Sequence, residues 1–334
     1  MAKTTCVLSL TVLLALFGAD QAQAQTKGGP PRLLETIRFE RDVPYTASDN
    51  PQQCLDILLP KRPHDDKPLP VVMFIHGGGW KGGDKRAGIP QLIPLVETGQ
   101  YAVISIGYRL STEAIWPAQI HDCKAAIRWI RANAGKYNLD ADHIGVMGPS
   151  AGGHLSAMLG TSGDVKSLEG NLGKHSEVSS RVACVVDWFG PSDLPAMNNG
   201  VPRREAADSA MSGLLGGKVE DKMDLAREAS PVTYVTKDDS PFLIIHGTED
   251  RLVPVDQSRR LHAKLKETGV DSMLIEVEGG GHGNFQSAEL QRRIRLFFGK
   301  HLRGQDVSIS SDAIKPDIAG RPKARTAPDR VPAE

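Results

Sequence analysis

The sequence of 334 residues lacks a net charge, because 40 Lys and Arg residues balance 40 Asp and Glu residues. Proteins that bind nucleic acid or an anionic membrane through bulk electrostatics normally carry an excess of positive charge. No internal repeat is visible either, so a repeat architecture is not expected. We therefore predict no nucleic-acid partner and no charge-driven membrane partner, and the sequence gives no indication of oligomeric state.

Cysteine is scarce, with four residues in the whole chain. Their spacing does not resemble that of metal ligands, so no metal site is expected. Once Cys6 is removed with the leader described next, Cys54, Cys123 and Cys184 remain, which is an odd number. We predict no essential disulfide, with a bond from Cys54 to one of the other two as the alternative.

A hydrophobic run long enough to span a membrane is missing as well. The apolar stretch from Val7 to Phe17 is far shorter than the ~20 residues that a span needs. It follows the basic residue Lys3 and precedes Ala22-Gln23-Ala24, which has the small-x-small pattern of a signal-peptide cleavage site. We predict that residues 1–24 are a signal peptide and that the mature protein is secreted or periplasmic, without stable membrane insertion. A transmembrane anchor is the alternative.

The opposite end, residues 304–334, shows little apolar periodicity and many Pro, Asp, Lys, Arg and Ser residues. Such a segment buries too little apolar surface to offset the entropy lost on ordering. We predict a disordered tail. A docked strand around residues 307–309 is the alternative.

Between these ends, hydrophobic residues make up enough of the chain for one large core or two small ones, and strand-like runs alternate with helix-like runs. The strand-like runs cover residues 55–59, 71–75, 102–108, 143–147, 182–188, 242–246 and 272–277. The helix-like runs cover residues 89–97, 118–134, 151–159, 257–268 and 288–302. This order predicts an α/β fold with a mostly parallel, doubly wound sheet. Many strand runs are continuously apolar, as expected for strands with helices on both faces.

Two segments depart from the alternation. No helix separates the strand around residues 36–45 from the next strand, so these two are predicted to form an antiparallel edge. The segment 194–239 is a long insert with two helical stretches, residues 203–215 and 219–228, of mainly polar composition. A loop of this length without structure of its own is uncommon. We predict that it forms a cap over the site.

The first motif with chemical meaning is Gly148-Pro149-Ser150-Ala151-Gly152, which follows a strand and precedes a helix. It matches G-x-S-x-G, in which a strand turns sharply into a helix with a strained serine at the tip. Residues two positions to either side must be very small for the turn to form. Ser150 is therefore the candidate nucleophile.

A serine hydroxyl needs a base to accept its proton, and in this kind of sheet the order is serine, acid, histidine. The strand ending at residue 246 is followed by Gly247-Thr248-Glu249-Asp250, and the strand ending at residue 277 is followed by His282 within a run of glycines. His282 is the candidate base. We favour Asp250 over Glu249 as the acid, although Asp250 could instead cap the next helix.

Three consecutive glycines, Gly77, Gly78 and Gly79, follow the strand at residues 71–75. Acyl transfer places negative charge on a carbonyl oxygen, which backbone N–H groups can stabilise if they are already aimed at it. Side chains in this loop would occupy the space of the substrate. Gly78 and Gly79, with Ala151 after the nucleophile, are the predicted oxyanion donors, and Gly77 comes next.

Two tryptophans, Trp80 and Trp188, are candidates to line a substrate pocket, because flat aromatic walls suit sugar or aryl groups. A core position is the alternative for Trp188. Four other polar residues are predicted to have mainly structural roles. These are His76, Asp122, His154 and Asp193.

Together, the segments HGGGW, GPSAGG, DWFGPSD, HGTEDRLVP and GGGHG resemble α/β-hydrolase esterases. They are most similar to the bifunctional feruloyl and acetyl-xylan (carbohydrate) esterases, near the hormone-sensitive-lipase type, over residues 35–303. The resemblance implies an α/β-hydrolase catalytic domain over residues 25–303. It also implies a Ser150–His282–Asp250 triad and no cofactor.

These observations predict a secreted serine carboxylesterase for short-chain acyl or aryl esters, with a small-molecule or carbohydrate ester as substrate. Acetyl or feruloyl esters of carbohydrates fit this class. Two alternatives are a serine peptidase of the prolyl-oligopeptidase type and a non-catalytic binding module on the same fold. The first usually adds a large N-terminal propeller, for which the residues before Val71 are too few.

Overall fold

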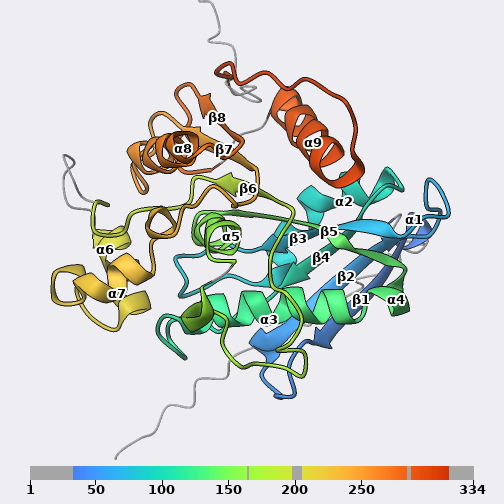
Figure 1. Cartoon of the computed structure of the whole chain (residues 1–334), viewed down its shortest axis with the longest axis horizontal. Coiled ribbons are helices and arrows are strands. Elements are labelled where there is room, and N and C mark those ends of the chain that lie inside the picture. Colours follow the sequence, from blue (N-terminus) through green and yellow to red (C-terminus); the bar gives the residue numbers. More distant parts are fainter. Residues whose placement is uncertain (1–32, 164, 198–204, 284–286, 316–334) are drawn as a thin grey trace, which may run out of the picture.

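The computed structural model describes residues 33–163, 165–197, 205–283 and 287–315, and its centre is a sheet of eight strands (Figure 1). The spatial order is β1-β2-β4-β3-β5-β6-β7-β8. The strands are β1 (Ile37–Pro44), β2 (Cys54–Pro60), β3 (Leu69–Ile75), β4 (Ala102–Ile106), β5 (Leu139–Pro149), β6 (Cys184–Trp188), β7 (Phe242–Gly247) and β8 (Ser272–Val277). The β1–β2 and β2–β4 pairs are antiparallel, and the others are parallel. The predicted mostly parallel sheet with an antiparallel N-terminal edge is confirmed.

Helices cover both faces of this sheet (Figure 1). One face carries α2 (Ile89–Glu97) and α9 (Ala288–Arg303), and the other carries α3 (Ala118–Ala132), α5 (Ala151–Thr161) and α8 (Asp256–Thr268). The short helices α1 (Leu33–Thr36) and α4 (Ala134–Tyr137) lie next to β1 and β5.

The central strand β3 shows why the strand runs are continuously apolar. Successive side chains of a strand point to opposite faces. Val71, Met73 and Ile75 accordingly belong to one hydrophobic core, and Val72 and Phe74 belong to the other. Because helices cover both cores, no position of β3 faces solvent.

The insert between β6 and β7 contains α6 (Glu205–Leu215) and α7 (Met223–Glu228), with a short 3-10 turn at Val219–Asp221. These helices lie beside α5, at the end of the sheet where β5 passes into α5 (Figure 1). Trp116 holds the insert in place, because its backbone N–H donates to the carbonyl of Leu214 and its indole N–H donates to Glu228.

The tail prediction needs a correction for residues 304–315. The N–H of Ile314 donates to the carbonyl of Glu276, and the carbonyl of Ile314 accepts from the N–H of Glu278. The Ile314 side chain is buried, and Arg293 on α9 donates to two carbonyls of the segment. The segment is attached because Ile314 pairs with the end of the edge strand β8, an arrangement that composition does not reveal. The remaining predicted tail, residues 316–334, lies outside the described residues.

The predicted signal peptide, residues 1–24, also lies outside the described residues. Within the part of the chain that the structure describes, no helix combines the length and the apolar character that crossing a membrane requires. Cys54, Cys123 and Cys184 carry free thiols.

Candidate active site

Ser150 occupies the turn between β5 and α5 with φ 55° and ψ −120°, a conformation that a non-glycine residue adopts only when its surroundings enforce it. A Cβ atom on Gly148 or Gly152 would lie 2.3 Å or 2.0 Å from the carbonyl oxygen of Ile75. Only glycine fits at these two positions. The backbone N–H of Ser150 donates to the carbonyl of Trp188, which fixes the turn against β6.

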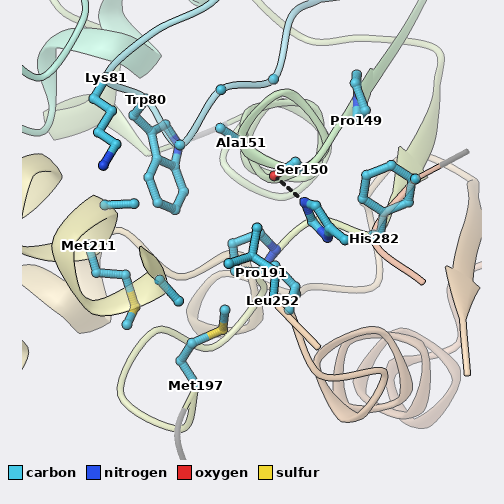
Figure 2. Close-up of a pocket in the computed structure, with 18 residues that line it drawn as sticks. Trp80, Lys81, Pro149, Ser150, Ala151, Pro191, Met197, Met211, Leu252 and His282 are labelled. Atoms are coloured by element: carbon cyan, nitrogen blue, oxygen red, sulfur yellow. Dashed lines mark hydrogen bonds between the residues drawn. The ribbon is translucent and has the colours of Figure 1, made fainter. Parts of the chain in front are cut away.

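His282 bridges Ser150 and Asp250, although the three residues lie far apart in the sequence. Its Nε2 is 3.0 Å from the Ser150 hydroxyl oxygen, a hydrogen bond drawn as a dashed line in Figure 2. Its Nδ1 is 2.7 Å from Oδ2 of Asp250. With the proton on Nδ1, the ring donates to the carboxylate and Nε2 can accept the serine proton. This is the arrangement that activates a serine for attack on a carbonyl carbon.

The surroundings of Asp250 keep it ionised. Burial raises the pKa of this carboxyl group, but hydrogen bonds from His246 and His282 outweigh burial, so the pKa lies well below its usual range. Oδ1 also accepts the backbone N–H groups of Leu252 and Val253. Asp250 therefore stabilises the local turn and holds His282 at the same time.

Glu249, the alternative acid, does not take part. Its side chain is exposed, and its backbone N–H donates to the carbonyl of Gly280. The structure thus brings Asp250, and not Glu249, to His282.

Sequence reasoning missed His246, the last side chain of β7. Its Nε2 is 3.2 Å from Oδ2 of Asp250 and 2.9 Å from the carbonyl of Val253, while Nδ1 is 2.7 Å from the hydroxyl of Ser258. The sequence did indicate a role for His246, because a histidine at the end of an otherwise apolar, buried strand needs polar partners.

The glycine loop lies beside Ser150. Gly78 and Gly79 have φ values of 119° and 59°, and a Cβ on Gly78 would lie 2.2 Å from the carbonyl oxygen of Gly82. Among the loop and turn hydrogen bonds of the described residues, none has the N–H of Gly78, Gly79 or Ala151 as donor. These three residues line the same pocket as Ser150.

His76, at the start of this loop, has the structural role predicted for it. Its Nδ1 is 2.8 Å from the carbonyl of Gly77, and its ring stacks on Tyr108 at 4.3 Å. Burial lowers the pKa of His76, which favours the neutral ring.

A pocket of about 440 Å³ opens above Ser150, and its wall is mainly apolar (Figure 2). Besides Ser150, His282 and the glycine loop, the lining residues are Trp80, Lys81, Pro149, Ala151, Phe189, Pro191, Met197, Ala207, Ala210, Met211, Leu252, Val253 and Gly283. Trp80 lines the pocket as predicted. Trp188 does not, and it packs instead against the core under α9, beside Phe189. The alternative reading of Trp188 is the correct one.

The inner face of the cap also differs from expectation. The insert is polar in composition, yet Ala207, Ala210 and Met211 of α6 turn toward the pocket together with Met197. Polar residues of α6 face outward, as Ser209 does. An amphipathic helix explains both observations, because average composition does not report which face meets the cavity.

Asp122 and Asp193 have the structural roles predicted for them. Asp122 is buried and accepts hydrogen bonds from the backbone and guanidinium of Arg109. Asp193 accepts from the N–H of Ala196, and one of its carboxylate oxygens lies 3.8 Å from the guanidinium of Arg260.

Comparisons with known proteins agree with this architecture. The family model BD-FAE matches residues 55–265. Esterase LipC of Mycobacterium tuberculosis is 34% identical over 238 residues, which cover 70% of this chain and 58% of that protein. The chain thus spans less than two thirds of the length of this curated relative.

Two solved structures are similar to the chain at 37% identity. One is a truncated form of a carbohydrate esterase from gut microbiota, with a TM-score of 0.74, covering 80% of this chain and 97% of the other. The second is a bifunctional GH43-CE protein of Bacteroides eggerthii, with a TM-score of 0.73, covering 79% of this chain and 35% of the other. The chain belongs to the BD-FAE family and has the α/β-hydrolase fold.

Proposed function

We propose that this chain is a serine carboxylesterase for short-chain acyl or aryl esters. The observation that carries the proposal is the hydrogen-bonded series Ser150–His282–Asp250 at the base of an apolar pocket. The esterases among its relatives support the same reaction class. Fold alone would not be sufficient, since this fold hosts many activities.

In the proposed reaction, His282 accepts the hydroxyl proton of Ser150 as the serine oxygen attacks the ester carbonyl carbon. The N–H groups of Gly78, Gly79 and Ala151 stabilise the resulting oxyanion. The carbon–oxygen bond to the alcohol then breaks, and His282 gives its proton to the leaving oxygen. Water attacks the acyl-enzyme by the same route and releases the acid.

Acetyl and feruloyl esters of carbohydrates are the proposed substrates. The carbohydrate esterase among the similar structures supports this class, and Trp80 offers a flat wall to an aryl or sugar group. We further propose that the protein is secreted or periplasmic, on the basis of the signal-peptide pattern in residues 1–24.

The test uses the chain beginning at Gln25 with p-nitrophenyl acetate, butyrate and octanoate, methyl ferulate, an acetylated xylo-oligosaccharide and a peptide amide. Ser150→Ala should lower kcat by roughly 10⁶. Ser167→Ala is the matched control, because Ser167 is exposed and lies outside the pocket. Ester turnover lost only in Ser150→Ala is the expected result.

Turnover of the peptide amide alone would overturn the esterase proposal in favour of a peptidase. A folded chain that neither turns over any substrate nor reacts with a fluorophosphonate at Ser150 would instead indicate a binding module.

A further inference from the structure

His154 is a buried histidine on α5 that the proposed chemistry does not use. Its side chain is fully buried, and it is not among the residues that line the pocket. The indole N–H of Trp80 donates to Nδ1 of His154 at 3.1 Å, and Nε2 lies 2.7 Å from the carbonyl oxygen of Ala229. Because Nδ1 accepts, the ring proton is on Nε2, which donates to Ala229. Both ring nitrogens are therefore committed to fixed partners.

Trp80 has a strained backbone and therefore needs a partner, such as His154, to hold its side chain. It follows Gly78 and Gly79 directly, and its φ of 57° lies in the left-handed region. A bulky residue stays in this region only when its surroundings hold it there. The carbonyl of Trp80 accepts from the N–H of Ser111, and its indole is held by His154. The backbone and the side chain are each anchored at one point.

His154 also lies where three parts of the molecule meet. It belongs to the helix that follows Ser150, it contacts the glycine loop through Trp80, and Ala229 directly follows the cap helix α7. The ring of Trp116 packs edge-on against His154 at 5.8 Å. Trp116 is hydrogen-bonded to α7 through its indole N–H and to α6 through its backbone N–H. One neutral imidazole thus joins the nucleophile helix, the glycine loop and the base of the cap.

We propose that His154 is a positioning residue that fixes Trp80, and through Trp80 the N–H groups of Gly78 and Gly79, at the place where the oxyanion forms. This inference rests on the proposed esterase function. Small displacements of a stabilising donor are costly in catalysis, because the donors must already be aimed at the transition state. Substrate binding depends less on the direction of these N–H groups, so a change at His154 should lower kcat more than it changes KM.

The environment of His154 keeps the ring in the form that this role requires. Burial lowers the pKa of His154 to about 4. The ring is therefore neutral near pH 7, and Nδ1 remains an acceptor for the indole N–H of Trp80.

Three variants of His154 distinguish a role in positioning Trp80 from a role in packing alone. His154→Asn retains an acceptor near the position of Nδ1, His154→Gln retains a donor near the position of Nε2, and His154→Leu retains neither. We expect His154→Leu and His154→Gln to lower kcat on p-nitrophenyl butyrate by about 10- to 100-fold, with KM within about threefold. We expect His154→Asn to stay within about fivefold of wild type. The Ki of a trifluoromethyl ketone, which forms an oxyanion on Ser150, should rise in parallel with the loss of kcat.

Trp80→Phe provides an independent test if a His154 variant does not fold. It removes the indole donor and keeps an aromatic wall in the pocket. On its own, Trp80→Phe should lower kcat and raise the inhibitor Ki in parallel. Where His154→Leu folds, the loss of kcat caused by Trp80→Phe should be at least fivefold smaller in that background than in wild type, because the two changes break the same bond.

The proposal is overturned if His154→Leu retains kcat, or if the Asn and Gln variants lose kcat equally. It is also overturned if Trp80→Phe leaves kcat and the inhibitor Ki unchanged. Failure of the underlying function is distinct, since wild type itself would then hydrolyse no ester.

Discussion

At the scale of single residues, both oxygens of the Asp250 carboxylate have polar partners. One oxygen accepts two backbone N–H groups of its own turn, and the other faces the imidazoles of His246 and His282. Each contact favours the ionised form, which orients His282 and would stabilise its charged state in the proposed reaction.

Asp250→Asn should therefore lower kcat by roughly 10³- to 10⁴-fold, because an amide can present its N–H to His282 and favour the wrong tautomer. KM should change little. Steady-state hydrolysis of p-nitrophenyl butyrate measures the effect, with Glu249→Gln as the neighbouring control that should behave like wild type. An equal loss in the Glu249 variant would contradict the assignment of the acid.

A second buried carboxyl group, that of Asp187, has surroundings that favour the protonated form instead. Asp187 on β6 is buried, Oδ1 accepts the N–H of Gly190, and Oδ2 has no hydrogen-bond partner within the described residues. Burial raises the pKa of Asp187 to about 7. The carboxyl group is consequently protonated in the folded protein at pH values where it is ionised in the unfolded chain.

This difference predicts a pH dependence of stability. The pKa of Asp187 is about 4 in the unfolded chain and about 7 in the folded protein. Its contribution to the free energy of unfolding is therefore complete below about pH 4 and is lost as the pH rises through about 7. Asp187→Asn does not titrate. The Tm of the variant minus that of wild type should therefore increase by several degrees between pH 5 and pH 8. A difference in Tm that stays constant over this range would contradict the raised pKa.

At the scale of elements, α6 supplies part of the pocket wall. The helix turns Ala207, Ala210 and Met211 toward the cavity, and His282 lies on the other side of Ser150 from Met211 (Figure 2). His282 must lie next to the leaving alcohol to protonate it. We therefore predict that Met211 faces the acyl half of the proposed substrate.

Met211→Phe should reduce kcat/KM for p-nitrophenyl octanoate relative to acetate by about 5- to 10-fold, since a pocket discriminates acyl length by a few kcal/mol at most. The ratio of the two kcat/KM values is the measurement. Ser209→Phe, on the exposed side of the same helix, is the matched control and should leave the ratio unchanged. An unchanged ratio in the Met211 variant would place the acyl group elsewhere.

At the scale of the whole molecule, the segment 304–315 connects helix α9 to the strand that leads into the active site. It pairs with β8 through Ile314, and β8 leads into the loop that carries His282. Ile314 also occupies part of one edge of the sheet, where unpaired N–H and C=O groups would otherwise be exposed.

A chain ending at Arg303 should consequently be less stable than one ending at Lys315, by about 2–4 kcal/mol from the burial of Ile314 and two backbone hydrogen bonds. The comparison is made by urea unfolding of both truncated chains beside the full chain. The chain ending at Lys315 is the control and should match the full chain. Equal stability of all three would show that the segment contributes nothing.

The sequence by itself determined the order of strands and helices, the turn at Ser150, the glycine loop and the candidates Asp250 and His282. These features depend on local patterns: hydrophobic periodicity, the glycines that a sharp turn requires, and polar residues directly after strands. Parallel strands end at one edge of the sheet, so their order alone was sufficient to bring these residues together.

The sequence already favoured Asp250 over Glu249, and the structure places Asp250 against His282. Only the tertiary structure decided the contact of His246 with Asp250 and the bond from Trp80 to His154. The tertiary structure also decided that Trp188 packs against the core and that Ile314 pairs with β8. Each depends on the direction of one side chain relative to a residue distant in sequence. Periodicity and composition describe a residue's own segment, whereas a buried hydrogen bond is determined by both of the segments that it joins.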